Sequence, residues 1–402
     1  MGNSRVLACL GALLTASAAF AQTPSPLLVP SSQFPNGQTP AAYIYVANTP
    51  AGGNSNQVIA YAAASNGKLT PVQGSPFADN ISAMAVNGQY LMATDRATPN
   101  IDAYLIGSDG ALTYATSTNY AQYNDPNNPC GAAGQVFFDH TGASLYVTES
   151  EASDACANDV IASFEVEKRS GGLDYLGLAN SGTFPGDYVP AYFIGNNNYA
   201  YSADQSGCLY PGTYGYQRDS SGLLNYIANF TYNTPTPPPG VRIYYPDLAV
   251  ADALNHVAIL EQPANPPGCA NGPLQLAVYT ADAQGNIHTK STYKDMPASK
   301  IVSVFDMKVS PSGKLLAVAG KEGLQIFHFN GAKPITHYTG LITKEEISQM
   351  FWDNDDHLYA ISYGSGQLLV YTITPTTHRM AAGAPYAITQ PQDIIVQPLS
   401  AH

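Results

Sequence analysis

The stretch DIIVQP, residues 393–398, follows the pattern of DMKVSP, residues 306–311, which opens an internal unit of the chain. In the internal unit a turn at Ser312-Gly313 and the apolar run Leu315–Ala319 come next, whereas no such turn and strand follow the C-terminal copy. The first unit begins at Tyr43 without an inner strand before it. We therefore expect a ring of β-sheets that takes its closing strand from the C-terminus, which hides the sheet edges that a linear array would expose.

A short apolar strand that ends in a small or polar residue recurs seven times. Its copies are Ile44–Asn48, Leu91–Asp95, Leu145–Glu149, Ala200–Asp204, Val257–Glu261, Leu316–Gly320 and Leu358–Ser362. Most copies precede an alternating strand and a Gly-containing hairpin, such as Asn66-Gly67 or Asp109-Gly110, and these pairs are strong hairpin signals. The repeat predicts an all-β fold. We expect a seven-bladed β-propeller of four-stranded antiparallel blades, with the C-terminal strand completing blade one.

The N-terminal residues indicate an export signal. Arg5 precedes an apolar run that extends to Phe20, and Ala19-Phe20-Ala21 before Gln22 is a small-x-small cleavage site. We therefore expect a signal peptide over 1–21, a Pro-rich extended leader over 22–40 and a single propeller domain over 41–402. After cleavage near Ala21-Gln22 the protein is expected in the periplasm or outside the cell, without membrane insertion.

The charge balance argues against some classes of partner. Removing Arg5 with the signal leaves 15 basic residues against 29 acidic ones, a net charge of −14. No cluster of Lys and Arg is present to follow a phosphate backbone, so neither nucleic acid nor an anionic membrane surface is expected as a partner. A small molecule, a carbohydrate and a protein all remain open as ligands.

Export gives the cysteines a meaning, because disulfides persist in oxidising compartments. Without Cys9, which lies in the signal, the mature chain has Cys130, Cys156, Cys208 and Cys269. The repeat map places the first two in same-face loops of blade three, and the last two in equivalent loops of blades four and five. We predict the disulfides Cys130–Cys156 and Cys208–Cys269. Four buried free thiols are the alternative, and metal binding has less support because no CxxC motif is present.

Four acidic residues hold the same repeat position in blades two to five: Asp95, Glu149, Asp204 and Glu261. Because second-strand ends lie on a circle around the channel, these carboxylates are candidates for a ligand-binding rim. Tyr188 and Tyr245 lie in nearby loops, and aromatic faces beside carboxylates suit sugars or cationic ligands. The alternative interpretation is that each carboxylate caps its own loop and that the tyrosines pack within the loops.

Three segments carry a family resemblance: YIYVAN (43–48), GKLTPVQGSPF (67–77) and VSPSGKLLAVAG (309–320). They resemble the seven-bladed lactonase-like propellers, which include 6-phosphogluconolactonase and muconate-cyclising enzymes, and also the exported YVTN-type repeat proteins. For the enzymes, the resemblance implies Arg, His and Glu near the channel mouth, where they would polarise a lactone carbonyl and activate water. Glu261 stands at the family glutamate position, but Pro246-Asp247 replaces the expected Arg-His pair. Arg242 is the nearby candidate for a displaced cation.

Other catalytic signatures are absent from the sequence, which has no GxSxG, HExxH, phosphate-binding Gly-rich loop or CxxCH. The run Asp353–Asp356 resembles a calcium loop but is explained by turn chemistry, so neither a metal nor a cofactor is expected. We expect a binding or scaffold propeller with its ligand on the long-loop face at the channel mouth. The alternative is a 6-phosphogluconolactonase-like hydrolase of a cyclic ester that uses Glu261, with Arg242 as the cation.

Overall fold

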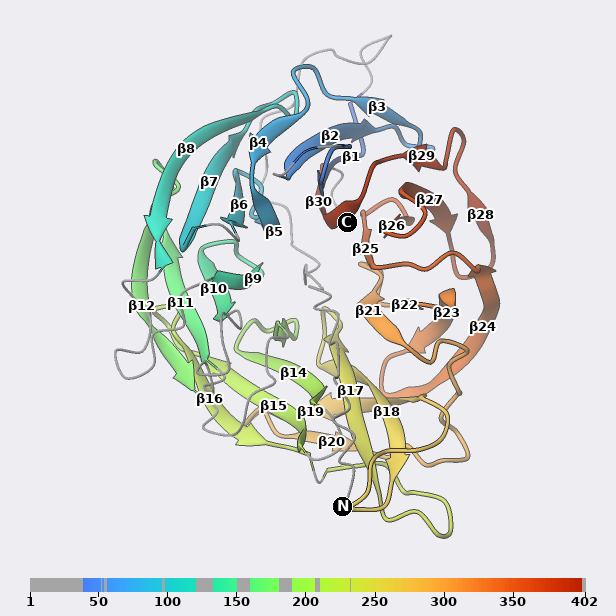
Figure 1. The fold of residues 1–402 in the computed structure, drawn as a ribbon. Helices are drawn as coiled ribbons and strands as arrows, with labels where there is room; N and C mark the ends of the chain where they lie inside the picture. The colour runs from blue at the N-terminus through green and yellow to red at the C-terminus, as the bar shows by residue number, and fades with distance from the viewer. Residues whose placement is uncertain are drawn as a thin grey trace, which may run out of the picture.

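The computed structural model describes residues 39–399, except for 52, 54–55, 96–97, 121–132, 150–159, 181–189, 207–209 and 232. Within these residues, seven antiparallel sheets surround a central axis (Figure 1). The predicted seven-bladed propeller is thereby confirmed. The predicted signal peptide, and the leader up to residue 38, lie outside the described residues and stay predictions. None of the described segments forms a helix long and apolar enough to cross a membrane.

Each blade has an inner strand at the channel and three further strands toward the outside. Blade one contains β30 (Pro391–Pro398), β1 (Ala42–Asn48), β2 (Gln57–Ala63) and β3 (Leu69–Pro71), and β4 (Phe77–Asp79) also pairs with β2. Blade two contains β5 (Ile81–Val86), β6 (Tyr90–Asp95), β7 (Asn100–Ile106) and β8 (Leu112–Asn119). Blade three contains β9 (Ala133–Phe138), β10 (Ser144–Glu149), β11 (Val160–Val166) and β12 (Leu173–Asn180).

The other four blades repeat this order. Blade four contains β13 (Tyr192–Phe193), β14 (Tyr199–Ser206), β15 (Tyr210–Arg218) and β16 (Leu224–Asn229). Blade five contains β17 (Ile243–Ala251), β18 (His256–Ala264), β19 (Gln275–Ala281) and β20 (Ile287–Thr289). Blade six contains β21 (Val304–Val309), β22 (Leu315–Gly320), β23 (Gly323–Asn330) and β24 (Lys333–Thr343). Blade seven contains β25 (Gln349–Trp352), β26 (His357–Ser362), β27 (Gln367–Ile373) and β28 (His378–Met380), and β29 (Tyr386–Ala387) pairs with β27.

The C-terminal strand closes the ring. β30 pairs antiparallel with β1, so that Ala42 lies opposite Pro398 and Val46 lies opposite Ile394. Figure 1 shows the red β30 beside the blue β1, at the channel edge of blade one. Ile394, Ile395 and Val396 are at most 1% exposed. The closure predicted from the sequence is therefore confirmed, and β1 does not present an unpaired inner edge.

Side chains extend this closure from one inner strand to the next. The Asp306 carboxylate on β21 accepts a hydrogen bond from the Met350 amide of β25 at 2.8 Å. In turn the Gln349 side chain on β25 accepts one from the Ile394 amide of β30 at 2.6 Å. These bonds satisfy inner-strand amides that have no ladder partner on the channel side. They join blade six to blade seven, and blade seven to blade one.

A second set of contacts joins neighbouring blades near their outer hairpins. The Tyr45 hydroxyl of blade one donates to the Gly110 carbonyl of blade two at 3.0 Å, and the Tyr201 hydroxyl of blade four donates to the Gly285 carbonyl of blade five at 2.8 Å. Gly110 has a φ of 82°, and a Cβ atom there would lie 2.4 Å from the Tyr43 ring. The hairpin needs glycine because of both the backbone conformation and the close approach of the ring.

The Asp353–Asp356 run is a turn between β25 and β26, as predicted. The Asp353 carboxylate accepts hydrogen bonds from the amides of Asp355 and His357 at 2.8 and 2.9 Å. Its other oxygen lies 2.8 Å from Nδ1 of His357 and accepts a hydrogen bond from the Tyr359 hydroxyl at 2.8 Å. Asp353 thus organises its own turn, in agreement with the turn chemistry predicted from the sequence.

Deleting residues 389–402 is expected to abolish cooperative folding. The deletion exposes β1 and removes three buried apolar side chains, each worth roughly 1.5–3 kcal/mol, in a fold whose total stability is typically about 5–15 kcal/mol. Circular dichroism melting and size-exclusion chromatography would show an aggregated or molten product. A control that lacks only residues 400–402, beyond β30, is expected to melt like the full-length mature protein. A full cooperative transition in the longer deletion would contradict closure by β30.

Candidate functional site

A bulge at the inner strand positions the predicted acidic residues. In blades two and five, the ladder between the inner and second strands skips Ser82 and Asp247, respectively, and the next pairs are Ile81 with Asp95 and Pro246 with Glu261. Blade three has a similar register shift immediately before Glu149, whereas Asp204 lies on β14 beyond the two residues that pair with β13. Asp95, Glu149 and Glu261 therefore share a register position, as the repeat predicted. The bulges themselves were not apparent from the sequence.

Glu261 does not face shared solvent, contrary to the expectation of an exposed rim. Its side chain is buried, with the residue 1% exposed, on the same side of β18 as Ile259, which packs against blade four. The Tyr279 hydroxyl of β19 donates a short hydrogen bond to Oε1 of Glu261, and Oε2 has no hydrogen-bond partner among the described residues. Burial raises the pKa of Glu261 to about 8, although the bond from Tyr279 acts in the opposite direction. Burial therefore favours the protonated form of Glu261 at pH 7.

Arg242 lies apart from Glu261. Its guanidinium is exposed and donates to the Pro266 carbonyl at 2.9 Å, and its backbone amide bonds to Asn265, both in the connection between β18 and β19. Glu261 pairs with Pro246, which follows Arg242 by four residues in the chain. At about 3.4 Å per residue, this places the two backbones roughly 13 Å apart. The structure therefore does not bring the two predicted catalytic residues together.

The other predicted ligand-binding residues do not form a described cluster. Asp95 and Glu149 end β6 and β10, but their side chains lie outside the described part of the chain. Asp204 is half-buried within β14. Tyr188 lies outside the described residues, and Tyr245 is buried in β17 with 6% exposure. Tyr245 is thus a packed strand residue, which fits the alternative interpretation of the tyrosines.

The predicted disulfides involve mostly undescribed residues. Cys130, Cys156 and Cys208 lie outside the described segments, and Cys269 lies in the connection between β18 and β19. The pairings Cys130–Cys156 and Cys208–Cys269 therefore stay predictions.

Two adjoining pockets lie on the channel wall of blades four to six. One is a recess that is partly open to solvent and has internal room for about one water molecule. It is lined by His140, Tyr192, Phe193, Val250–Ala253 and Lys308–Pro311. The other is of similar size and is lined by Pro190, Tyr192, Ala203, Leu248, Ala249 and Phe305–Met307. Tyr192 belongs to both walls. The two pockets therefore meet at this residue, the first toward the short turns and the second toward the long loops.

Lys308 is the polar centre of the wall between the pockets, and the residue is 4% exposed. Its ammonium lies 2.5 Å from Oδ1 of Asp306, donates to the Tyr192 hydroxyl at 3.2 Å, and lies 5.6 Å from the centroid of the Tyr192 ring. Burial alone would lower the pKa of Lys308, but Asp306 and Tyr192 together raise it. Sequence reasoning did not select Lys308, although it stands where the C-terminal copy of the repeat has Ile395. That exchange of an apolar residue for a lysine was the available signal.

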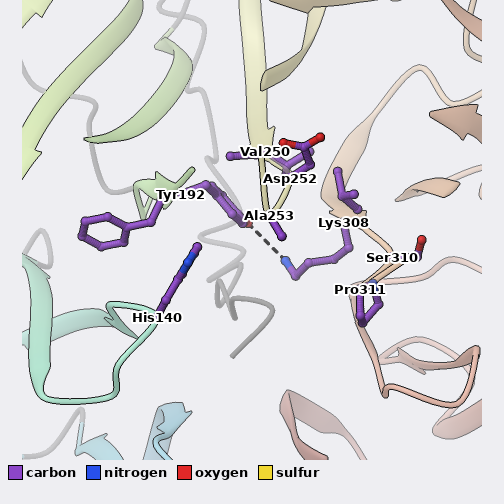
Figure 2. Close-up of a pocket in the computed structure, with 11 residues that line it drawn as sticks. His140, Tyr192, Val250, Asp252, Ala253, Lys308, Ser310 and Pro311 are labelled. Carbon is purple, nitrogen blue, oxygen red and sulfur yellow. Dashed lines mark hydrogen bonds between the residues drawn. The ribbon is translucent and has the colours of Figure 1, made fainter. Parts of the chain in front are cut away.

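His140 approaches the same pocket from blade three. Figure 2 shows its ring and the Lys308 side chain extending toward the pocket from opposite sides, with the Tyr192 hydroxyl at the end of the lysine. Burial lowers the pKa of His140, and the neighbouring Asp139 together with a hydrogen bond to the Phe193 backbone only partly offsets this. Burial therefore favours the neutral form of the imidazole, whose hydrogen bond to the Phe193 backbone fixes the ring beside the pocket.

Comparison with known proteins shows similarity in structure and not in sequence. No protein-family model matches the chain, and no curated protein matches its sequence. A candidate 6-phosphogluconolactonase from Bacteroides uniformis superimposes with a TM-score of 0.61 at 12% identity, over 88% of this chain and 99% of that one. A second candidate 6-phosphogluconolactonase, from Bacteroides fragilis, gives 0.56 at 12% identity, over 88% and 97% of the two chains.

A hypothetical selenium-binding protein from Sulfolobus tokodaii is also similar, with a TM-score of 0.59 at 9% identity, over 94% of this chain and 98% of that one. At such identities the likeness shows the fold alone, because one propeller architecture carries many activities. The strand and hairpin motifs had indicated this architecture. The chain therefore has the seven-bladed propeller fold of the lactonase-like proteins.

Proposed function

We propose that the protein is an exported binding propeller whose small ligand enters the channel from the long-loop face. The observation that carries this proposal is the separation of the two candidate catalytic groups. Glu261 is enclosed beside Tyr279, whereas Arg242 is exposed and bonded to the Pro266 carbonyl. Lactone hydrolysis needs a donor or cation at the carbonyl oxygen together with a base at the attacking water. Within the described part of the chain, a buried and mainly protonated carboxyl group that lies apart from Arg242 provides neither.

The channel wall provides a second support for binding. The pocket lined by Pro190 and Phe305 lies near the ends of the inner strands that adjoin the long loops. Its wall is mostly apolar, with the Asp306 carboxylate as its charged group. The recess thus offers an apolar surface and one carboxylate to a ligand that enters the channel. Export, cleavage near Ala21-Gln22 and the two disulfides are parts of the same proposal and rest on the sequence.

A lactonase that uses Glu261 is the second candidate. The pKa of about 8 favours it, because a general acid works best when its pKa lies near the working pH. The enclosed position of the carboxyl group and the distance to Arg242 speak against it. An activity measurement separates the two functions directly.

The mature protein is expected not to accelerate lactone hydrolysis. A pH-stat assay with D-glucono-1,5-lactone and γ-butyrolactone should give rates equal to those of the buffer, because the candidate residues Glu261 and Arg242 do not converge on a shared space. Glu261→Gln should leave these rates unchanged. Hydrolysis well above the buffer rate that disappears in Glu261→Gln would contradict the binding proposal and establish the lactonase. A screen of the same preparation against soluble glycans and organic acids would then identify ligands.

Replacing Glu261 by Gln is expected to change how stability depends on pH. The folded protein keeps a proton on Glu261 up to about pH 8, whereas an unfolded chain releases it near pH 4.5. The contribution of Glu261 to the free energy of unfolding is therefore fully present below pH 4.5. It falls by roughly 1.4 kcal/mol per pH unit as the pH rises toward 8. Glu261→Gln keeps an acceptor for Tyr279 without this loss. The difference in melting temperature between Glu261→Gln and the wild type should therefore increase, in favour of the variant, from pH 5 to pH 8.

The exposed Glu345 provides a matched control, since Glu345→Gln removes the same charge at the surface. Its melting temperature should follow that of the wild type across the pH range. Parallel pH profiles for Glu261→Gln and the wild type would show that Glu261 is ionised in the folded protein.

A further inference from the structure

Each blade of the propeller ends in an outer strand with one edge that has no ladder partner, and most of these edges are protected. β3, β20 and β28 are only three residues long. β12 carries Asp174, and β24 carries Lys333 and Pro334. β16 is uncharged but packs against β11 and β12 of blade three. Short strands, charged side chains, proline and covering elements all prevent a sheet edge from pairing with another chain.

The outer strand of blade two, β8, lacks these protections. Its sequence LTYATSTN has eight residues without a charge or a proline, and five of them are exposed. Within the described part of the chain, no backbone hydrogen bond joins Thr113–Ser117 to a segment other than β7, and β4 touches β8 without pairing with it. Figure 1 shows β8 at the outer rim of the ring, beyond β7. β8 therefore presents an open edge to solvent.

Bulges do not explain the difference between β8 and the other long outer strands. A register shift occurs in the ladder of β8 and also in the ladders of β12, β16 and β24. The feature that sets β8 apart is the combination of length, exposure and absence of charge. Such an edge is a template for an added strand, because its outward amides and carbonyls remain available.

An exposed apolar side chain flanks this edge on each face of the sheet. Tyr114 of β8 is 58% exposed, and Leu105 of β7, which lies opposite Thr113, is 41% exposed. Because successive strand residues point to opposite faces, Tyr114 and Leu105 lie on different faces. The Tyr104 ring meets the Tyr114 ring edge-on, with 5.8 Å between the centroids, and so restrains it. A strand added beside β8 thus gains apolar contact on both faces at a small cost in side-chain entropy.

The charge of the chain restricts where two copies can meet. With 29 acidic residues against 16 basic ones, two copies repel one another, and an uncharged surface is where this repulsion is smallest. The edge of β8 is also suited to its own copy. Two identical strands related by a two-fold axis pair antiparallel, and each brings the same uncharged backbone and the same Tyr114 and Leu105.

We propose that β8 is a homodimer interface, in which the β8 strands of two copies pair antiparallel and join two blades into one continuous sheet. The interface is small, so the dimer is weak, with a dissociation constant of roughly 10–100 µM. It lies on the outer rim and does not depend on the ligand proposed for the channel. Because the copies repel one another, added salt should strengthen the association.

Sedimentation velocity of the mature protein from about 1 to 500 µM tests the proposal, and the mass should rise reversibly from monomer to dimer. The double variant Thr113→Lys with Ala115→Lys places like charges opposite one another across the two-fold axis, so its dissociation constant should rise at least about tenfold. Asn225→Lys with Thr336→Lys makes the same change in charge at exposed positions of β16 and β24, and should dimerise like the wild type. A monomer at every concentration, or equal dimerisation of all three proteins, would overturn the proposal.

Photochemical cross-linking keeps the test decisive if the lysine variant does not fold. With Tyr114 replaced by p-benzoylphenylalanine, illumination should produce a covalent dimer whose cross-link maps to β8 of the other copy. The same replacement at Tyr363, a 43% exposed tyrosine of blade seven, should produce none. A cross-link from position 114 within one chain would show that another segment of the chain covers β8. That result, or a cross-link to a different strand of the second copy, would refute the interface.

Discussion

The ladder between β30 and β1 is the interaction on which the rest of the structure depends. It joins residues about 350 positions apart in the sequence, and every other blade is assembled from consecutive strands. A contact of such sequence separation is costly in chain entropy, so it must be supported by burial and by hydrogen bonds. Ile394–Val396 supply the burial, and the bond from the Ile394 amide to Gln349 fixes the strand against blade seven. The ring closes because β30 is bound both to β1 of blade one and to β25 of blade seven.

Closure of the ring also determines which polar side chains can lie on the channel wall. Inner strands packed around a ring have one face toward the channel, so a polar residue there must be paired or exposed. Asp306 and Gln349 are paired through amides of the next blade, and Lys308 is paired through Asp306 and Tyr192. The same arrangement that holds blades six, seven and one together therefore leaves a cation beside a cavity.

Much of the architecture could be predicted from the sequence because it follows local rules. Glycine hairpins, alternating strands and the matching DIIVQP and DMKVSP segments each indicate geometry by residue type and spacing. The site was less predictable, because burial and bulges arise only when blades pack. Glu261 has the expected register, but its side chain points between blades four and five toward Tyr279. Lys308 carries no motif, and its partner Tyr192 is 116 residues away along the chain, so only the fold brings them together.

Native-state hydrogen exchange of β30 tests the central claim most directly. If β30 is the strand that holds the ring closed, its amides from Ile394 to Val396 can exchange only when the whole propeller opens. Their protection should then equal that of the inner strand β25, with the same dependence on denaturant. Exchange of β30 at rates about a hundredfold faster than β25, through local opening with the other blades still protected, would contradict the account.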